Sequence, residues 1–222
     1  MSGEGDERSV PARAGRGEVR ELASRFFAFA RHTPSRADAE EELARLRREH
    51  HDATHVAFAW RIGTGDLAST RASDAGEPPG TAGRPIASAI ESSGLTDVLV
   101  AVVRHFGGTR LGTGGLARAY RLAAERALED AGSEAVYDTV LVTIRCPFEK
   151  TGEVRRLLDP PGTRLRSERF TPEPVLELEV RRSRLAALEA ALGEARLEHR
   201  VMTRDSPDSQ SQIPNPKSKS KI

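Results

Sequence analysis

The sequence predicts an α+β protein with two domains, on three observations. The middle of the chain has a valine-rich run at 98–103, a glycine-rich segment at 106–115 and an amphipathic stretch at 116–131, which is the order strand, loop, helix. Residues 139–202 then carry strand and helix patterns in the order β-α-β-β-α-β, the order of a ferredoxin-like unit. The length of 222 residues suits one large domain or two small ones.

The predicted domains span about 18–135 and 136–203, and segments of simpler composition flank them. Residues 1–17 are predicted to be a flexible arm, because Gly, Arg, Glu and Ser dominate there. This arm lacks the apolar region of a secretory signal peptide. The tail at 204–222 is rich in Ser, Pro and Lys and is predicted to be disordered.

Charge and cysteine content limit the classes of function. The 34 basic and 33 acidic side chains nearly cancel, so any surface that binds nucleic acid must be local. Cys146 is the only cysteine, which excludes an intramolecular disulfide and favours a reducing compartment. No apolar run is long enough to cross a bilayer. We therefore expect a cytoplasmic protein without a membrane partner.

Apolar spacing and local signals predict the elements of the first domain. Residues 18–30 suit a strand with a turn near Ala23 and Ser24. Ser35 is the expected N-cap of a helix over 36–49, whose apolar residues share one face. The other predicted elements are a strand at 54–62, a polar loop at 63–72, a glycine- and proline-rich loop at 73–85, a helix at 84–93 ended by Gly94, a strand at 96–104 and a helix at 116–131 ended by Gly132.

The second domain is predicted from alternation, helical spacing and turn signals. Val140, Val142 and Ile144 face one way in an alternating strand, and Cys146 at its end suggests a small core residue. The predicted elements are strands at 139–146, 164–170, 175–180 and 196–202, helices at 147–158 and 183–192, and a turn at 159–162.

The segment at 106–115, which contains five glycines, resembles an anion-binding loop. A helix start presents free backbone N–H groups and the positive end of the helix dipole. Arg110, Arg118 and Arg121 lie in the loop or the first turns of the helix, where positive charge is better tolerated if an anion binds. The alternative is that the arginines point into solvent and the glycines only shape a turn. Neither the Walker A pattern nor GxGxxG is present.

Asp74 and Glu77 are the candidates for acid–base chemistry, since they lie three residues apart in the loop at 73–85. Asp-Ala-Gly is also ordinary turn chemistry, and Glu77 can brace the loop by accepting hydrogen bonds from backbone or arginine donors. No nucleophile with a base partner accompanies them, so we predict no catalytic residue and favour a protein that is not an enzyme.

Histidines and aromatic residues add little chemistry. The three histidines within 50–55 lack an HExxH pattern, so we predict no metal ion, and we predict no cofactor. His105 adjoins the glycine-rich segment and either bonds a phosphate or packs as a neutral side chain. Phe106, Tyr120 and Trp60 are too sparse for a base-stacking platform, and Tyr120 is expected in the core.

Two stretches carry a resemblance to a known family. SDAGEPPGTAGRPI at 73–86 and VAVVRHFGGTRLGTGGLARAY at 100–120 resemble the IMPACT/YigZ family, whose patterns are close to SDDGEPxGTAGxPI and VVVRYFGGxKLGTGGLxRAY. The resemblance covers about residues 18–203. Arg110 replaces a common lysine and adds planar, bidentate donors. His105 replaces a common tyrosine, which puts in doubt any stacking by a ring at that position.

The resemblance implies an N-terminal domain of the ribosomal protein S5 domain 2-like class, with one sheet covered by helices on one side. It also implies a small ferredoxin-like C-terminal domain. Eukaryotic relatives act as translational regulators by binding the large scaffold that activates a stress kinase for an initiation factor. The RWD domain that these relatives carry for their scaffold partner is not expected here, so we do not transfer kinase regulation to this chain.

We therefore predict a non-enzymatic, translation-associated regulatory protein that binds an anionic partner, either RNA or the surface of a ribosome or translation factor. The alternatives are an enzyme that binds a phosphorylated small molecule or nucleotide at the same loop, and a protein–protein adaptor. The oligomeric state stays open. The predicted binding residues are Ser73, Asp74, Glu77, Thr81, Arg104, His105, Gly107, Gly108, Arg110, Gly112, Gly114, Gly115, Arg118 and Arg121.

Overall fold

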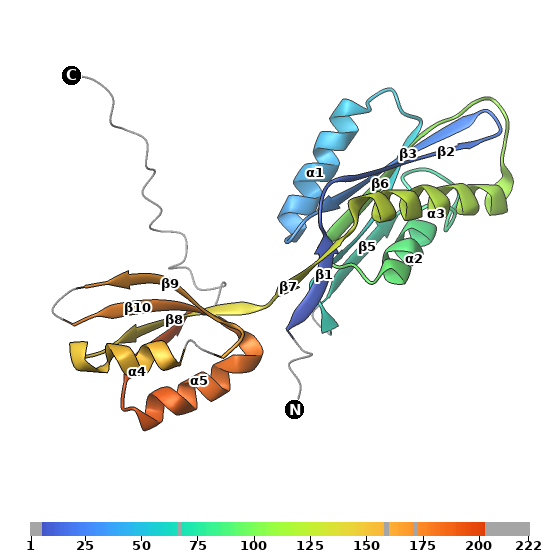
Figure 1. The fold of residues 1–222 in the computed structure, drawn as a ribbon. Helices are drawn as coiled ribbons and strands as arrows, with labels where there is room; N and C mark the ends of the chain where they lie inside the picture. Colours follow the sequence, from blue (N-terminus) through green and yellow to red (C-terminus); the bar gives the residue numbers. More distant parts are fainter. Residues whose placement is uncertain (1–5, 66–67, 158–159, 171–172, 203–222) are drawn as a thin grey trace, which may run out of the picture. The chain divides into compact units, whose positions relative to one another are not determined.

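The computed structural model describes residues 6–65, 68–157, 160–170 and 173–202, which form two compact units (Figure 1). The N-terminal unit is Arg8–Val136, and the C-terminal unit begins at Tyr137 and includes Asp6 and Glu7. This division falls one residue from the predicted boundary. Helices and strands are mixed in each unit, so the predicted α+β class is confirmed.

The N-terminal unit is built on a five-stranded antiparallel sheet in the order β2-β3-β6-β4-β5. Its central strand β6 is buried along its length up to Arg104, because helices cover both faces of the sheet. The bounds are β2 Gly15–Glu21, β3 Ser24–His32, β4 His55–Ile62, β5 Ser69–Ser73 and β6 Val98–His105.

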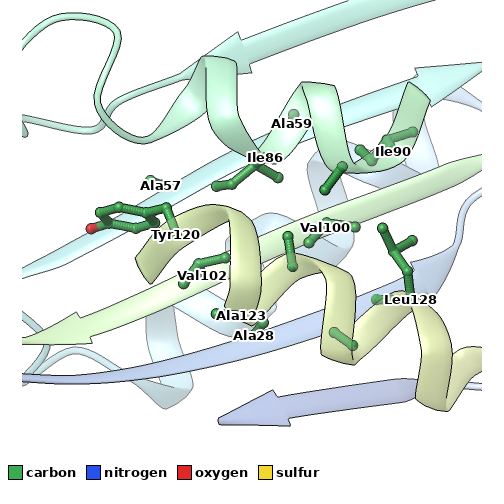
Figure 2. Close-up of a cluster of buried hydrophobic side chains, with 14 of the residues drawn as sticks. Ala28, Ala57, Ala59, Ile86, Ile90, Val100, Val102, Tyr120, Ala123 and Leu128 are labelled. Atoms are coloured by element: carbon green, nitrogen blue, oxygen red, sulfur yellow. The ribbon is translucent and has the colours of Figure 1, made fainter. Parts of the chain in front are cut away.

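Two helices, α2 (Gly83–Ser93) and α3 (Gly112–Ala131), pack on one face of this sheet. Figure 2 shows side chains from both helices and from the strands pointing into one apolar cluster. Helix α1 (Arg36–Glu49) begins at the predicted N-cap Ser35 and packs on the opposite face. The expectation of helices on one side only is therefore wrong, because the sheet presents a second apolar face that α1 buries.

The predicted flexible arm is wrong for residues 7–17. Strand β1 (Glu7–Pro11) pairs with β7 (Ser133–Tyr137), and residues 15–17 open β2. Partners this far apart in the chain leave no local signal, and a strand with mixed composition gains its order from backbone pairing. Residues 1–5 and the predicted tail at 204–222 lie outside the described residues.

The C-terminal unit has the predicted β-α-β-β-α-β order and one antiparallel sheet in the order β11-β8-β10-β9. That combination is the ferredoxin-like arrangement. Asp6 accepts a hydrogen bond from the Ser183 N–H in the first turn of α5, and Cys146 is buried in the core as a free thiol. The elements are β8 Thr139–Arg145, η2 Phe148–Lys150, α4 Thr151–Arg156, β9 Thr163–Arg169, β10 Val175–Arg181, α5 Arg182–Glu194 and β11 Glu198–Met202.

Two predicted elements differ from the structure. The polar loop predicted at 63–72 contains most of edge strand β5, whose exposed side chains hide its pairing with β4. Helix α3 begins at Gly112 rather than at Leu116, because tertiary packing outweighs the low helix propensity of its glycines. Among the described residues, no helix has the length and apolarity needed to span a membrane.

Candidate functional site

Both glycine-rich loops lie at the end of the sheet where β6 ends. The first glycine loop (residues 74–82) leads into α2, and the second glycine loop (residues 106–111) leads into α3. Strands β3 and β4 begin at the same end, since Arg104 near the end of β6 pairs with Phe26 of β3 and with His55 of β4. The fold therefore brings together two segments that the sequence separates.

The carboxylate of Glu77 joins these loops. Its Oε1 accepts a hydrogen bond from Nη1 of Arg104 at 2.7 Å and another from the hydroxyl of Tyr120 at 2.7 Å. Burial first, and then the bond to Glu77, raises the pKa of Tyr120, so its hydroxyl stays protonated and donates. Glu77 thus ties the first glycine loop to β6 and α3, which is the bracing role that the sequence left open.

The Arg104 side chain is buried inside the N-terminal unit. The residue is 5% exposed, and its guanidinium carbon lies 5.5 and 5.4 Å from the ring centroids of Phe26 and Phe106. Its Nη2 also donates to Oγ of Ser24 at 3.4 Å. This burial gives no support to the prediction that Arg104 contacts a bound anion, because the side chain is engaged in a buried ion pair.

Asp74 caps helix α2 from a distance. The N-cap residue of α2, Ala82, offers no side-chain acceptor, and the Asp74 carboxylate instead accepts the N–H groups of Gly80, Ala82 and Gly83 at 2.8–2.9 Å. Desolvation alone would raise the pKa of Asp74, but these three donors outweigh it and hold the pKa below its usual value. This helix start is filled by a carboxylate of the chain itself.

The remaining predicted residues of the first glycine loop also shape it. Ser73 Oγ accepts from the Ala75 N–H at 3.3 Å, and Thr81 Oγ1 donates to the Pro78 carbonyl at 2.7 Å. All four predicted residues here, including both catalytic candidates, make internal hydrogen bonds that hold the loop. The predicted contact of these four residues with a partner finds no support in this geometry.

The second glycine loop is anchored at its start and open beyond it. The Phe106 N–H donates to Oγ1 of Thr54 at 3.1 Å, and the Gly107 N–H donates to Oγ of Ser24 at 3.4 Å. A Cβ on Gly107 would lie 1.9 Å from the Ala23 carbonyl oxygen, so only glycine fits. In contrast, a Cβ on Gly108 would meet no atom within 4 Å.

The start of α3 has no internal cap. Its N-cap Leu111 makes no side-chain hydrogen bond, and no acidic residue lies in its first turn. Gly112 and Gly114 are exposed, with nothing within 4 Å of the Cβ positions they lack. The first turn of α3 therefore receives no hydrogen bond from its N-cap side chain, whereas Asp74 occupies the corresponding groups of α2.

The predicted arginines and histidine divide into two groups. Arg110 and Arg118 are exposed beside the start of α3. Arg121 instead bonds Glu125 at 2.7 Å and also reaches Ser88 and Ser92 of α2, so it belongs to the packing of the two helices. His105 is partly buried and contacts the Phe27 ring edge-on at 5.9 Å. Of the predicted binding residues, the structure leaves these exposed at the start of α3: Gly107, Gly108, Arg110, Gly112, Gly114 and Arg118, with Gly115 partly exposed.

Sequence reasoning missed the anchors of this site. Ser24 and Thr54 hold the loops but belong to no motif, and the bond made by the Tyr120 hydroxyl is not visible in the stretch at 100–120 that contains it. His55 bonds the Ala75 carbonyl through Nδ1 at 2.9 Å. Within the described ranges, no three or more His, Cys, Asp or Glu side chains gather as a metal site.

Comparisons with known proteins match this chain over both units. The model of the Impact N-terminal domain matches residues 22–128. A Thermus thermophilus protein, described as an IMPACT family member in the pol 5′ region, is 47% identical over 135 residues, which cover 61% of this chain and 72% of the relative. An IMPACT family member of Haemophilus influenzae is 34% identical over 172 residues, which cover 77% of this chain and 84% of the relative.

One solved structure extends the match in three dimensions. A crystal structure described only as that of a hypothetical protein covers 90% of this chain and 98% of its own, with 26% sequence identity and a TM-score of 0.63. The two-unit architecture is therefore shared with a solved protein.

Proposed function

Since this chain belongs to the IMPACT family, we propose that it is a translation-associated regulatory protein that acts by binding rather than by catalysis. The proposed ligand is the phosphate backbone of RNA, and the proposed site is the start of α3. The role of eukaryotic relatives as translational regulators supports the translation link. The start of α3, with the exposed Arg110 and Arg118, supports phosphate as the ligand.

The starts of α2 and α3 differ in how they are capped. Two neighbouring helices begin in glycine-rich loops, and an arginine lies near each start, Arg84 at α2 and Arg118 at α3. At α2 the negative charge of Asp74 satisfies the backbone N–H groups. At α3 the N-cap side chain makes no such bond. An external anion completes α3 as Asp74 completes α2.

The charges around this start suit phosphate without base recognition. Arg110 and Arg118 supply two exposed guanidinium groups, which bind phosphate oxygens through bidentate hydrogen bonds. Contacts of this kind gain affinity by releasing counterions and carry no sequence information of their own. Because the whole chain has a formal charge of only +1, this local surface must supply the attraction.

The test is binding of a fluorescein-labelled RNA, followed by fluorescence anisotropy at several salt concentrations. The Arg110→Ala/Arg118→Ala variant is expected to weaken binding and to reduce the slope of log K against log salt by about 1 to 2, for two lost phosphate contacts. The matched control is Arg36→Ala/Arg48→Ala on α1, which removes the same charge from exposed positions on the opposite face of the sheet.

The control separates a local site from net charge. Equal weakening by both double variants would assign binding to overall charge and would contradict the proposal. Absence of RNA binding at low salt would also contradict it. If a protein partner still binds after nuclease treatment, and its binding does not depend on Arg110 and Arg118, the chain would be an adaptor instead.

A further inference from the structure

Phe106 is an exposed aromatic side chain beside the proposed phosphate site. Its side chain is 44% exposed, which places it among the few large apolar side chains that the described residues leave open to solvent. It opens the second glycine loop, five residues before the uncapped helix start at Leu111. A ligand that covered this ring would remove its apolar surface from water.

The backbone at Phe106 is held from two sides. The Phe106 N–H is bonded to Thr54, next to the start of β4, and the next residue, Gly107, is bonded to Ser24 and lies against the Ala23 backbone, next to the start of β3. A backbone fixed in this way loses little conformational entropy when a ligand binds.

A buried cation lies close to the ring. The Arg104 guanidinium carbon is 5.4 Å from the Phe106 centroid and 5.5 Å from the Phe26 centroid, so both rings lie within cation–π distance of it. Glu77 holds the guanidinium from the side at 2.7 Å. Because Arg104 is 5% exposed and Phe106 is 44% exposed, the free part of the ring faces solvent.

This arrangement favours one kind of ligand. The guanidinium already uses the negative potential of the ring, so a second cation is a poor partner for the open side. A flat, neutral π system packs on the exposed Phe106 ring without that penalty. Nucleobases present such faces, and base stacking on aromatic side chains is a sequence-tolerant source of affinity for single strands.

We infer that Phe106 stacks on an unpaired nucleobase, so that the RNA bound at the start of α3 is single-stranded there. Aromatic residues are too sparse here for a platform that stacks several bases, so the inference concerns one base on one ring. It rests on the proposed function and adds the class of RNA.

The test uses the full chain with two labelled probes of equal length, oligoadenylate and the same ribose-phosphate strand without bases. Phe106→Ala and Phe106→Leu are expected to weaken oligoadenylate binding about 5- to 150-fold and to leave binding of the abasic strand unchanged. Phe106→Trp is expected to retain binding, with emission quenched by oligoadenylate only, since the native Trp60 is buried. Phe148→Ala, which removes a 66% exposed ring from the C-terminal unit, is the matched control and should bind normally.

The two proposals fail in different ways. If Phe106→Leu binds oligoadenylate like the wild type, or the abasic strand binds as tightly as oligoadenylate, stacking is overturned, while loss of binding in Arg110→Ala/Arg118→Ala still supports the phosphate site. If neither probe binds at low salt, the proposed function itself is wrong. Thermal unfolding of each variant confirms that it is folded.

Discussion

At the scale of residues, Glu77 has the largest structural consequence. Its side chain is 3% exposed and pairs with an Arg104 side chain that is 6% exposed. A buried ion pair of this kind is weak evidence for net stability, but breaking it leaves an uncompensated buried charge. Both glycine loops depend on this pair for their relative position.

We predict that Glu77→Ala lowers the free energy of unfolding by about 3–5 kcal/mol, because Arg104 is left unpaired. Tyr120→Phe, which removes only the second donor to the carboxylate, should cost about 1.5–3 kcal/mol. Urea unfolding measures both values. The Glu77→Ala/Arg104→Ala double variant is expected to lose less than the sum of the single variants. Additive losses would contradict the coupling.

Glycines of the second glycine loop and of the start of α3 should separate into structural and open positions. Gly107→Ala is expected to cost about 3 kcal/mol, because its Cβ would lie 1.9 Å from a backbone oxygen of Ala23. Gly114→Ala meets no atom within 4 Å and is expected to leave stability unchanged or to raise it by up to about 1 kcal/mol. Thermal unfolding compares the two variants, and similar losses in both would contradict the assignment.

At the scale of elements, the decisive comparison is between the starts of α2 and α3. Both helices follow glycine-rich loops, and neither N-cap residue makes a side-chain hydrogen bond. Asp74 satisfies α2 from the first glycine loop, whereas α3 stays open. Local sequence predicted both helices, but the capping of one by a residue eight positions before its N-cap depends on how the loop folds back.

Asp74 predicts a pH dependence with a definite sign. Its pKa in the folded state is lowered, because three backbone donors outweigh desolvation. The carboxylate therefore stabilises the fold above its unfolded pKa of about 3.9, and this contribution is lost as the pH falls through the lower, folded-state pKa. Asp74→Asn is expected to be about 1 kcal/mol less stable than the wild type at neutral pH and to approach it in strong acid. Unfolding curves across pH measure the convergence.

The exposed Asp52, which lies in the turn after α1, provides the control for this pH series. Asp52→Asn should follow the wild-type curve at every pH. A constant gap between Asp74→Asn and the wild type down to strong acid would show that the Asp74 charge does not stabilise α2.

At the scale of the whole molecule, each unit is stabilised by apolar clusters of its own. Ile86 is buried between α2 and the sheet of the N-terminal unit, and Leu178 is buried in the sheet of the C-terminal unit. No residue is shared between the two clusters. Chains with separate cores commonly depart from a single two-state transition.

We predict two thermal transitions in calorimetry. Ile86→Ala and Leu178→Ala should each remove about 2–5 kcal/mol from one unit, because each creates a cavity in one core. Each variant should therefore lower a different transition and leave the other in place. A parallel shift of both transitions in either variant would show that the units unfold together.

The sequence by itself determined the α+β class, the ferredoxin-like order of the second unit, helix α1 with its Ser35 cap, and the two glycine-rich loops, because periodicity, caps and turn residues are local signals. Only the tertiary structure decided the pairing of β1, the burial of Arg104 and the filling of one helix start but not the other. Each of those depends on groups far apart in the chain, whose meeting costs loop-closure entropy and leaves no trace in composition or spacing. The candidate site therefore depends on the fold, which brings these distant groups together.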